Sequence, residues 1–155
     1  MNSAKSPVQS QPTIFFIFGG TGDLTSRKLV PALYNLFIDG WMPANFAIIG
    51  MGRTQQTDDQ FRDLLLEDIN KFSRSGKAES EKWKAFSSCV HFQVSDIKED
   101  KTYLDQLDRI KKLEEAWKEE PCLIYYLAVA PRFFSTIAEQ LAKHKLAANP
   151  EKSRV

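Results

Sequence analysis

A short glycine-rich loop near the start of the chain restricts the possible folds more than any other feature. Residues 13–18 (TIFFIF) form a continuous apolar run, which is typical of a strand that is covered on both faces. The loop GGTGDLT follows at once, and residues 24–38 then carry apolar side chains at helical spacing. The order strand, bare turn and helix is that of the first unit of a parallel α/β sheet.

The rest of the chain repeats this alternation. Strands are predicted at 46–50, 90–94 and 122–128, and helices at 57–69, 104–113 and 133–146, with a short helical turn near Trp83 and Phe86. Residues 153–155 have the composition of the start of another strand. The sequence therefore predicts an α/β fold, a doubly wound parallel sheet of the Rossmann type that is incomplete at its C-terminal end.

Composition excludes several classes of protein. The 155 residues are 43% hydrophobic and 26% charged, which fits one globular domain, and a net charge of +1 argues against nucleic-acid binding. Cys89 and Cys122 are isolated, so neither a disulfide framework nor a metal site is expected. Residues 1–12 are polar without a signal sequence, and no apolar run is long enough for a membrane helix. We expect a flexible N-terminal tail over 1–12 and a cytoplasmic protein that contacts no membrane.

The chemistry of the loop points to a phosphate ligand. Glycines allow a tight turn and let a pyrophosphate approach backbone N–H groups, while the following helix N-terminus adds partial positive charge. Thr21 and Thr25 are expected to add hydroxyl donors to a phosphate. Asp23 would repel a pyrophosphate, so we expect it to cap the helix N-terminus instead.

The residue after the second strand favours one cofactor. An NAD site usually has an acidic residue there, which binds the ribose hydroxyls. This chain reads IIGMGRT, so Arg53 occupies that place. A guanidinium can pair with a 2′-phosphate through two hydrogen bonds, and Thr54 can donate a further one. The sequence predicts NADP rather than NAD, with a solvated surface arginine as the alternative.

The third and fourth strands end in further candidate residues. Asp96 occupies the position where this fold usually contacts adenine, with Ile97 as an apolar wall, although a solvated loop aspartate is equally consistent. After the fourth strand, Ala128 and Ala130 leave room for a ribose or nicotinamide. Pro131 begins the next helix.

The segments FGGTGDLTSRKLVPALYNLF, IIGMGRT and YLAVAP, in this order, resemble the N-terminal coenzyme-binding part of the glucose-6-phosphate dehydrogenase family. In that family the first loop has the sequence Gly-Ala-Ser-Gly-Asp-Leu-Ala and is followed by three basic residues. This chain differs from the pattern at Gly20, Thr21, Thr25 and Ser26, and Ala130 replaces a proline of the family's later segment. The resemblance implies a cofactor-binding set of Gly19, Gly20, Thr21, Gly22, Asp23, Leu24, Thr25, Ser26, Arg53, Thr54, Asp96, Ile97, Tyr126, Ala128 and Pro131, with Lys28 on the substrate side.

The same resemblance implies an activity for the full-length protein. It would oxidise glucose 6-phosphate to 6-phospho-D-glucono-1,5-lactone with reduction of NADP, in the oxidative pentose phosphate pathway, as a homo-oligomer of two or four chains. The family's Glu-Lys-Pro and Arg-Ile-Asp-His-Tyr segments, which hold substrate and carry the base region, do not occur in the 155 residues. We therefore expect residues 13–155 to be a truncated NADP-binding domain without its substrate domain or catalytic residues. It would bind NADP but would not catalyse alone.

Two other classes of protein remain. A short-chain dehydrogenase or epimerase needs a tyrosine with a lysine four residues later, and none of the four tyrosines has one. A non-catalytic redox sensor that binds NADP and contacts a partner protein stays open. His91, in a predicted strand, and His144, late in a predicted helix, match no catalytic position, so we expect both to be structural or exposed.

Overall fold

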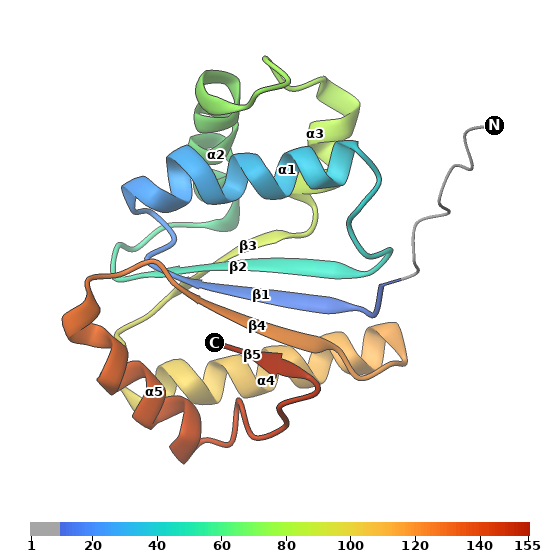
Figure 1. The fold of residues 1–155 in the computed structure, drawn as a ribbon. Helices are drawn as coiled ribbons and strands as arrows, with labels where there is room; N and C mark the ends of the chain where they lie inside the picture. The colour runs from blue at the N-terminus through green and yellow to red at the C-terminus, as the bar shows by residue number, and fades with distance from the viewer. Residues whose placement is uncertain (1–9) are drawn as a thin grey trace.

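The computed structural model describes residues 10–155, so most of the predicted N-terminal tail lies outside the described residues. A central sheet is covered by α1, α2 and α3 on one face and by α4 and α5 on the other (Figure 1). The elements are β1 (Thr13–Phe18), a π-helical turn (Thr25–Leu29), α1 (Val30–Ile38), β2 (Phe46–Gly52), α2 (Asp58–Phe72), α3 (Ser80–Ser87), β3 (Val90–Val94), α4 (Asp100–Trp117), β4 (Cys122–Leu127), a 3-10 turn (Pro131–Phe133), α5 (Phe134–Lys143) and β5 (Ser153–Arg154).

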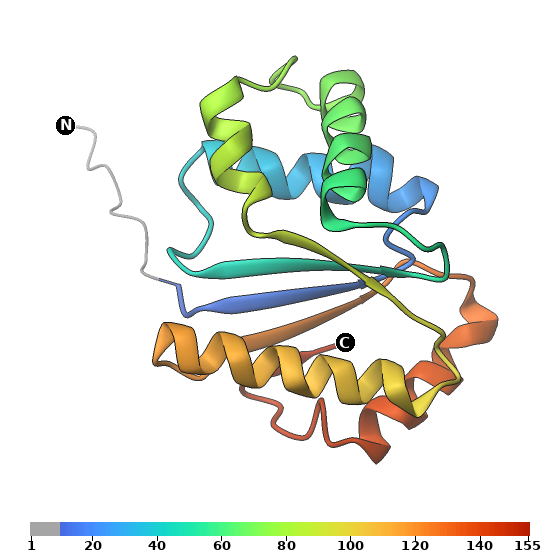
Figure 2. The same ribbon diagram turned by 180° about the vertical axis from the view of Figure 1, so that it is seen from behind.

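The sheet is parallel throughout, with the strand order β3-β2-β1-β4-β5. The chain moves outward from β1 to β3 and then returns to the other side of β1, so the order reverses between β1 and β4. A crevice opens at such a switch point, beyond the carboxyl ends of the strands. The predicted doubly wound α/β fold is confirmed, and Figure 2 shows the same layers from behind.

The two faces of β1 pack into separate cores. Ile17 lies in the core under α1, α2 and α3, whereas Phe16 and Phe18 lie in the core over α4 and α5. All three side chains are at most 1% exposed, which explains the continuous apolar run. The turn predicted at Trp83 and Phe86 is a full helix, α3, because fully buried Phe86 packs into an aromatic cluster.

The helix predicted at 24–38 begins with a π-helical turn instead of a regular α-helix. Pro31 lies near the start of α1, where it has no N–H to donate and its ring would crowd the carbonyl four residues earlier. A local widening of the helix relieves both problems.

Two other predictions are wrong in detail. The end of the predicted tail is part of the fold, since Pro12 is buried and its carbonyl accepts a bond from Cys122 N at 2.7 Å. The helix predicted at 104–113 extends over Asp100–Trp117, and it turns Leu104 and Leu107 to solvent and buries Tyr103 and Gln106. No helix within residues 10–155 is long and apolar enough to cross a membrane.

Candidate functional site

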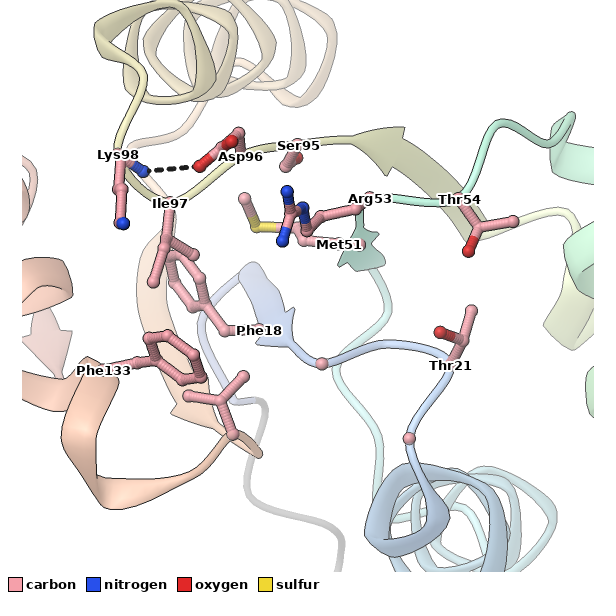
Figure 3. A pocket seen from close by; sticks show the side chains of 14 residues that line it. Phe18, Thr21, Met51, Arg53, Thr54, Ser95, Asp96, Ile97, Lys98 and Phe133 are labelled. Atoms are coloured by element: carbon pink, nitrogen blue, oxygen red, sulfur yellow. Dashed lines mark hydrogen bonds between the residues drawn. The ribbon is translucent and has the colours of Figure 1, made fainter.

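A cavity of about 430 Å³ opens at the switch point, beyond the carboxyl ends of β1, β2 and β3. Its wall on the β4 side comes from the loop and turn after that strand. Figure 3 shows side chains from these four segments facing one space. The lining residues are Phe18, Gly19, Thr21, Gly22, Met51, Gly52, Arg53, Thr54, Ser95, Asp96, Ile97, Lys98, Val129 and Phe133.

The glycine loop is held tightly against its neighbours. Gly19 has φ +85°, and both Gly19 N and Gly20 N donate to Met51 O, at 3.1 and 2.8 Å. A Cβ on Gly20 would lie 2.7 Å from Met51 N, so this position has no room for a side chain. Gly22 N donates to Gly19 O at 3.0 Å. The glycine amides are therefore used within the protein, and an anion would need other donors.

Those donors are at the start of the following helix. Its first backbone bond runs from Ser26 N to Gly22 O at 3.0 Å, so the amides of residues 23–25 come before any bond of this helical type. Unpaired amides at a helix start favour an anion. Thr21, which is exposed and lines the cavity, stands directly before them. The loop can bind a phosphate through the first helical turn rather than through its glycines.

Arg53 supplies the positive charge of the cavity at the end of β2. Its side chain extends from the strand end toward the middle of the cavity, whereas Thr54 lies on the other side of the strand end (Figure 3). It is exposed, and within residues 10–155 it forms no ion pair. Since no carboxylate occupies its N–H donors, this guanidinium can form two charge-assisted hydrogen bonds with a phosphate.

The segment after β3 forms the opposite wall. Ser95 N donates to Gly52 O at 2.7 Å, which joins this segment to the end of β2. Asp96 Oδ1 accepts from Lys98 N at 3.0 Å, and this bond closes a tight turn over the cavity. The structure thus brings Asp96 and Ile97 to the same cavity as Arg53.

Sequence reasoning missed the apolar part of the lining. Phe18 and Met51 are at or near the ends of β1 and β2, and Val129 and Phe133 come from the segment after β4. Nearness to the end of a predicted strand could have identified them, since the cavity lies at the strand ends. Ser95 and Lys98 were also missed, although they flank Asp96 and Ile97, which the sequence did select.

Other predicted residues lie outside the cavity lining, and two have roles that differ from the expectation. Thr25 is fully buried, and its hydroxyl donates to Gly19 O at 2.8 Å, so it is turned away from any phosphate. Asp23 makes no capping bond and pairs with Arg27 at 2.8 Å, since both side chains are exposed one helical turn apart. The cavity lining also lacks Gly20, Leu24, Ser26, Lys28, Tyr126, Ala128 and Pro131.

The two histidines have structural surroundings. His91 Nδ1 lies 3.0 Å from Asp58 Oδ2, and the ring of His144 stacks on Tyr103 with centroids 5.5 Å apart. Neither lines the cavity. No group of metal-ligating side chains occurs among residues 10–155.

Comparison with known proteins settles the family. A family model described as "Glucose-6-phosphate dehydrogenase, NAD binding domain" matches residues 16–155. The chain belongs to this family. The resemblance seen in the sequence motifs is thereby confirmed.

Individual members of the glucose-6-phosphate dehydrogenase family agree with this assignment. The chain is 33% identical to glucose-6-phosphate 1-dehydrogenase of Chlamydia pneumoniae, covering 91% of this chain and 27% of that protein. It is 34% identical to the Leuconostoc mesenteroides enzyme, covering 92% and 29%. A solved structure of glucose-6-phosphate dehydrogenase in complex with glucose 6-phosphate superposes with a TM-score of 0.78 at 26% identity, covering 94% and 30%. The chain thus spans less than a third of the length of these relatives.

Proposed function

We propose that this chain is the NADP-binding part of a glucose-6-phosphate 1-dehydrogenase. The full-length protein would oxidise D-glucose 6-phosphate to 6-phospho-D-glucono-1,5-lactone. Family membership supports the reaction, and the family model's own description names a nicotinamide dinucleotide. When bound, NADP supplies the acceptor for the hydride. The chain's own residues would bind and orient it, and no catalytic base is assigned to them.

The observation that carries the choice of NADP is the position of Arg53. It follows β2, where an acidic residue would favour the ribose hydroxyls of NAD, and it faces the same cavity as the glycine loop. A guanidinium there attracts a 2′-phosphate, and Thr54 lies close enough in sequence to share that anion. The first-turn amides next to Thr21 would hold the pyrophosphate.

The two halves of the coenzyme are assigned by the polarity of the cavity lining. Between Arg53 and Asp96 the lining is polar and would take the adenosine half, with Ile97 against the ring. The apolar side near Val129 and Phe133 would take the nicotinamide half. Lys28 is exposed on the π-helical turn, and we keep it as a candidate on the substrate side.

Calorimetric titration tests this proposal directly. NADP, NAD and adenosine 2′,5′-bisphosphate are titrated into wild-type chain, Arg53→Ala and Arg74→Ala. Arg74 is an exposed arginine outside the cavity that pairs with Asp39, so it is a matched control. Loss of a charge-assisted bond should weaken the two 2′-phosphorylated ligands about tenfold to hundredfold in Arg53→Ala only. Equal weakening of NAD would contradict the assigned role of Arg53.

The reaction itself is tested in the full-length protein, by following NADPH formation with glucose 6-phosphate as substrate. If the full-length protein binds NADP but does not oxidise glucose 6-phosphate, the redox-sensor alternative is favoured. A homo-oligomer of the full-length protein and a cytoplasmic location stay predictions.

A further inference from the structure

Three consecutive carbonyl groups in the loop after β3 are each held by a side chain from outside that loop. The loop, residues 96–98, lines the cavity. Two of the donors come from α4 and one from α5. The bonds run from Thr102 Oγ1 to Asp96 O at 2.7 Å, from Tyr103 OH to Ile97 O at 2.8 Å and from Gln140 Nε2 to Lys98 O at 3.1 Å.

The amides of Asp96 and Lys98, and that of the next residue, Glu99, are also bonded within this region. Asp96 N lies 3.1 Å from Thr102 Oγ1, Lys98 N donates to Asp96 Oδ1 at 3.0 Å, and Glu99 N donates to Asp96 O at 3.0 Å. A loop in which all three carbonyls and two of the three amides are bonded has few alternative conformations. The side chains of Asp96 and Ile97 are thus presented to the cavity in one fixed arrangement.

Tyr103 is the most firmly fixed of the three outside donors. It is fully buried, and its ring stacks on Phe18 with centroids 6.4 Å apart and on His144 with centroids 5.5 Å apart. Burial, with a smaller contribution from the negative charge of Asp96, raises the pKa of Tyr103 to about 12. The hydroxyl is therefore protonated at neutral pH and stays a donor to Ile97 O.

Gln140 connects two walls of the cavity. It lies in α5, the helix that begins directly after Phe133, which lines the cavity on the β4 side. Its bond to Lys98 O joins that helix to the loop after β3. A side chain that does not itself line the cavity thus links the two walls.

We propose that Tyr103 and Gln140 are positioning residues for the adenosine half of the coenzyme. They hold the 96–98 loop in its binding conformation before the ligand arrives, so that binding does not have to order it. This inference rests on the proposed function, since it requires the cavity to be the coenzyme site. It assigns a binding role to two residues that would not touch the ligand.

Two variants and one matched control test the proposal in the full chain. Tyr103→Phe removes the hydroxyl but keeps the ring, and Gln140→Met removes the amide but keeps the length. Tyr125→Phe is the control, because Tyr125 is also buried in the same core, but its hydroxyl donates at 2.8 Å to Leu146 O, which lies outside the 96–98 loop. Tyr103→Phe and Tyr125→Phe should therefore lose similar stability.

The first measurement is the affinity for adenosine 2′,5′-bisphosphate by calorimetry. Loss of one bond of ordinary strength should weaken binding roughly threefold to tenfold in Tyr103→Phe and Gln140→Met, with no change in Tyr125→Phe. The second measurement is amide hydrogen exchange without ligand. Exchange at residues 96–99 should be faster in the two loop variants than in the control.

The outcomes separate the two proposals. If wild-type chain binds adenosine 2′,5′-bisphosphate and both loop variants bind it equally well, the positioning role is wrong and the coenzyme site stands. If Tyr125→Phe weakens binding as much as Tyr103→Phe, the effect is one of general stability, and the positioning role is again wrong. If wild-type chain binds none of the ligand, both proposals are overturned.

Discussion

Gly19 and Ala128 are in contact through their backbones, at the point where the sheet order reverses. A Cβ built on Gly19 would lie 2.2 Å from Ala128 O, far inside any allowed contact. Ala128 N in turn donates to Phe18 O at 2.9 Å, so the backbone of Ala128 is joined to the end of β1. The loops after β1 and β4 thus form one unit, and the shape of the cavity depends on the absence of a side chain at Gly19.

Replacing Gly19 by alanine should therefore cost at least about 3 kcal/mol in the free energy of unfolding, from overlap and backbone strain together. Gly40→Ala separates the two causes. Gly40 has a similar φ of +77°, but a Cβ there would have no atom within 4 Å, so only the strain remains, about 1 kcal/mol. Denaturant unfolding of both variants measures the difference. Equal losses would show that the contact with Ala128 yields easily.

Thr25→Val tests the inward orientation of that hydroxyl. Its bond to Gly19 O is lost in the variant, but Gly19 O still accepts from Gly22 N, so the loss of stability should be about 1 kcal/mol. The affinity for NADP should change less than about twofold, because the hydroxyl is not available to a phosphate. Denaturant unfolding and calorimetry on the same variant check both statements. A large loss of affinity for NADP with unchanged stability would instead show that the Thr25 hydroxyl binds a phosphate.

The order of the elements could be predicted because strands buried on both faces are continuous apolar runs. Their exact ends could not. β2 was expected to end at Gly50 but continues to Gly52, which pairs with Val94 of β3, a neighbour that is distant in sequence. In α4 the core-facing row includes Gln106, which is fully buried with Nε2 3.2 Å from Met51 Sδ. Periodicity of apolar residues could not assign a polar side chain to the core, and the apolar neighbour Leu107 is exposed.

The site was predictable where a residue acts through its own chemistry. Arg53 was chosen for its charge and Asp96 for its position after the third strand, and the structure brings both to the cavity. Thr25 was chosen for its hydroxyl and Asp23 as a helix cap, but both are turned elsewhere, because a sequence does not give the direction of a side chain within a helical turn. The apolar lining, such as Phe133, depends on how the loops fold back over the sheet.

Thr57, the N-cap of α2, and Asp23, the expected cap of the first helix, make a matched pair for a third prediction. Thr57 forms a complete capping box with Gln60, accepting from Gln60 N at 3.1 Å, whereas Asp23 makes only an exposed ion pair with Arg27. Thr57→Ala should lower the free energy of unfolding by about 1 kcal/mol. Asp23→Ala should lower it by less than about 0.5 kcal/mol, as exposed pairs contribute little. Thermal and denaturant unfolding measure both variants, and a similar loss in each would mean that Asp23 does cap its helix in solution.

Asp58 covers the exposed edge of the sheet. β3 is an edge strand, and Asp58 Oδ1 accepts from Phe92 N at 2.8 Å, while Oδ2 lies 3.0 Å from His91 Nδ1. Burial alone would raise the pKa of Asp58, but the bonds from Phe92 N and His91, with the charges of His91 and Arg62, outweigh it, and the pKa is lowered. A carboxyl whose pKa is lower in the folded state stabilises the fold above its unfolded pKa of about 3.9, and this contribution is lost as the pH falls through the folded value.

The stability difference between wild type and Asp58→Asn should therefore be larger at about pH 6 than at about pH 3, where protonation has removed most of what the carboxylate contributes. Asp59→Asn is the control, because Asp59 is adjacent on the same helical turn but is exposed and bonds only to Arg62 at 3.1 Å. Its substitution should change stability little at either pH. Urea unfolding of the three proteins at both pH values measures these differences. A difference for Asp58→Asn that is the same at both pH values would show that the amide replaces the carboxylate fully at the strand edge.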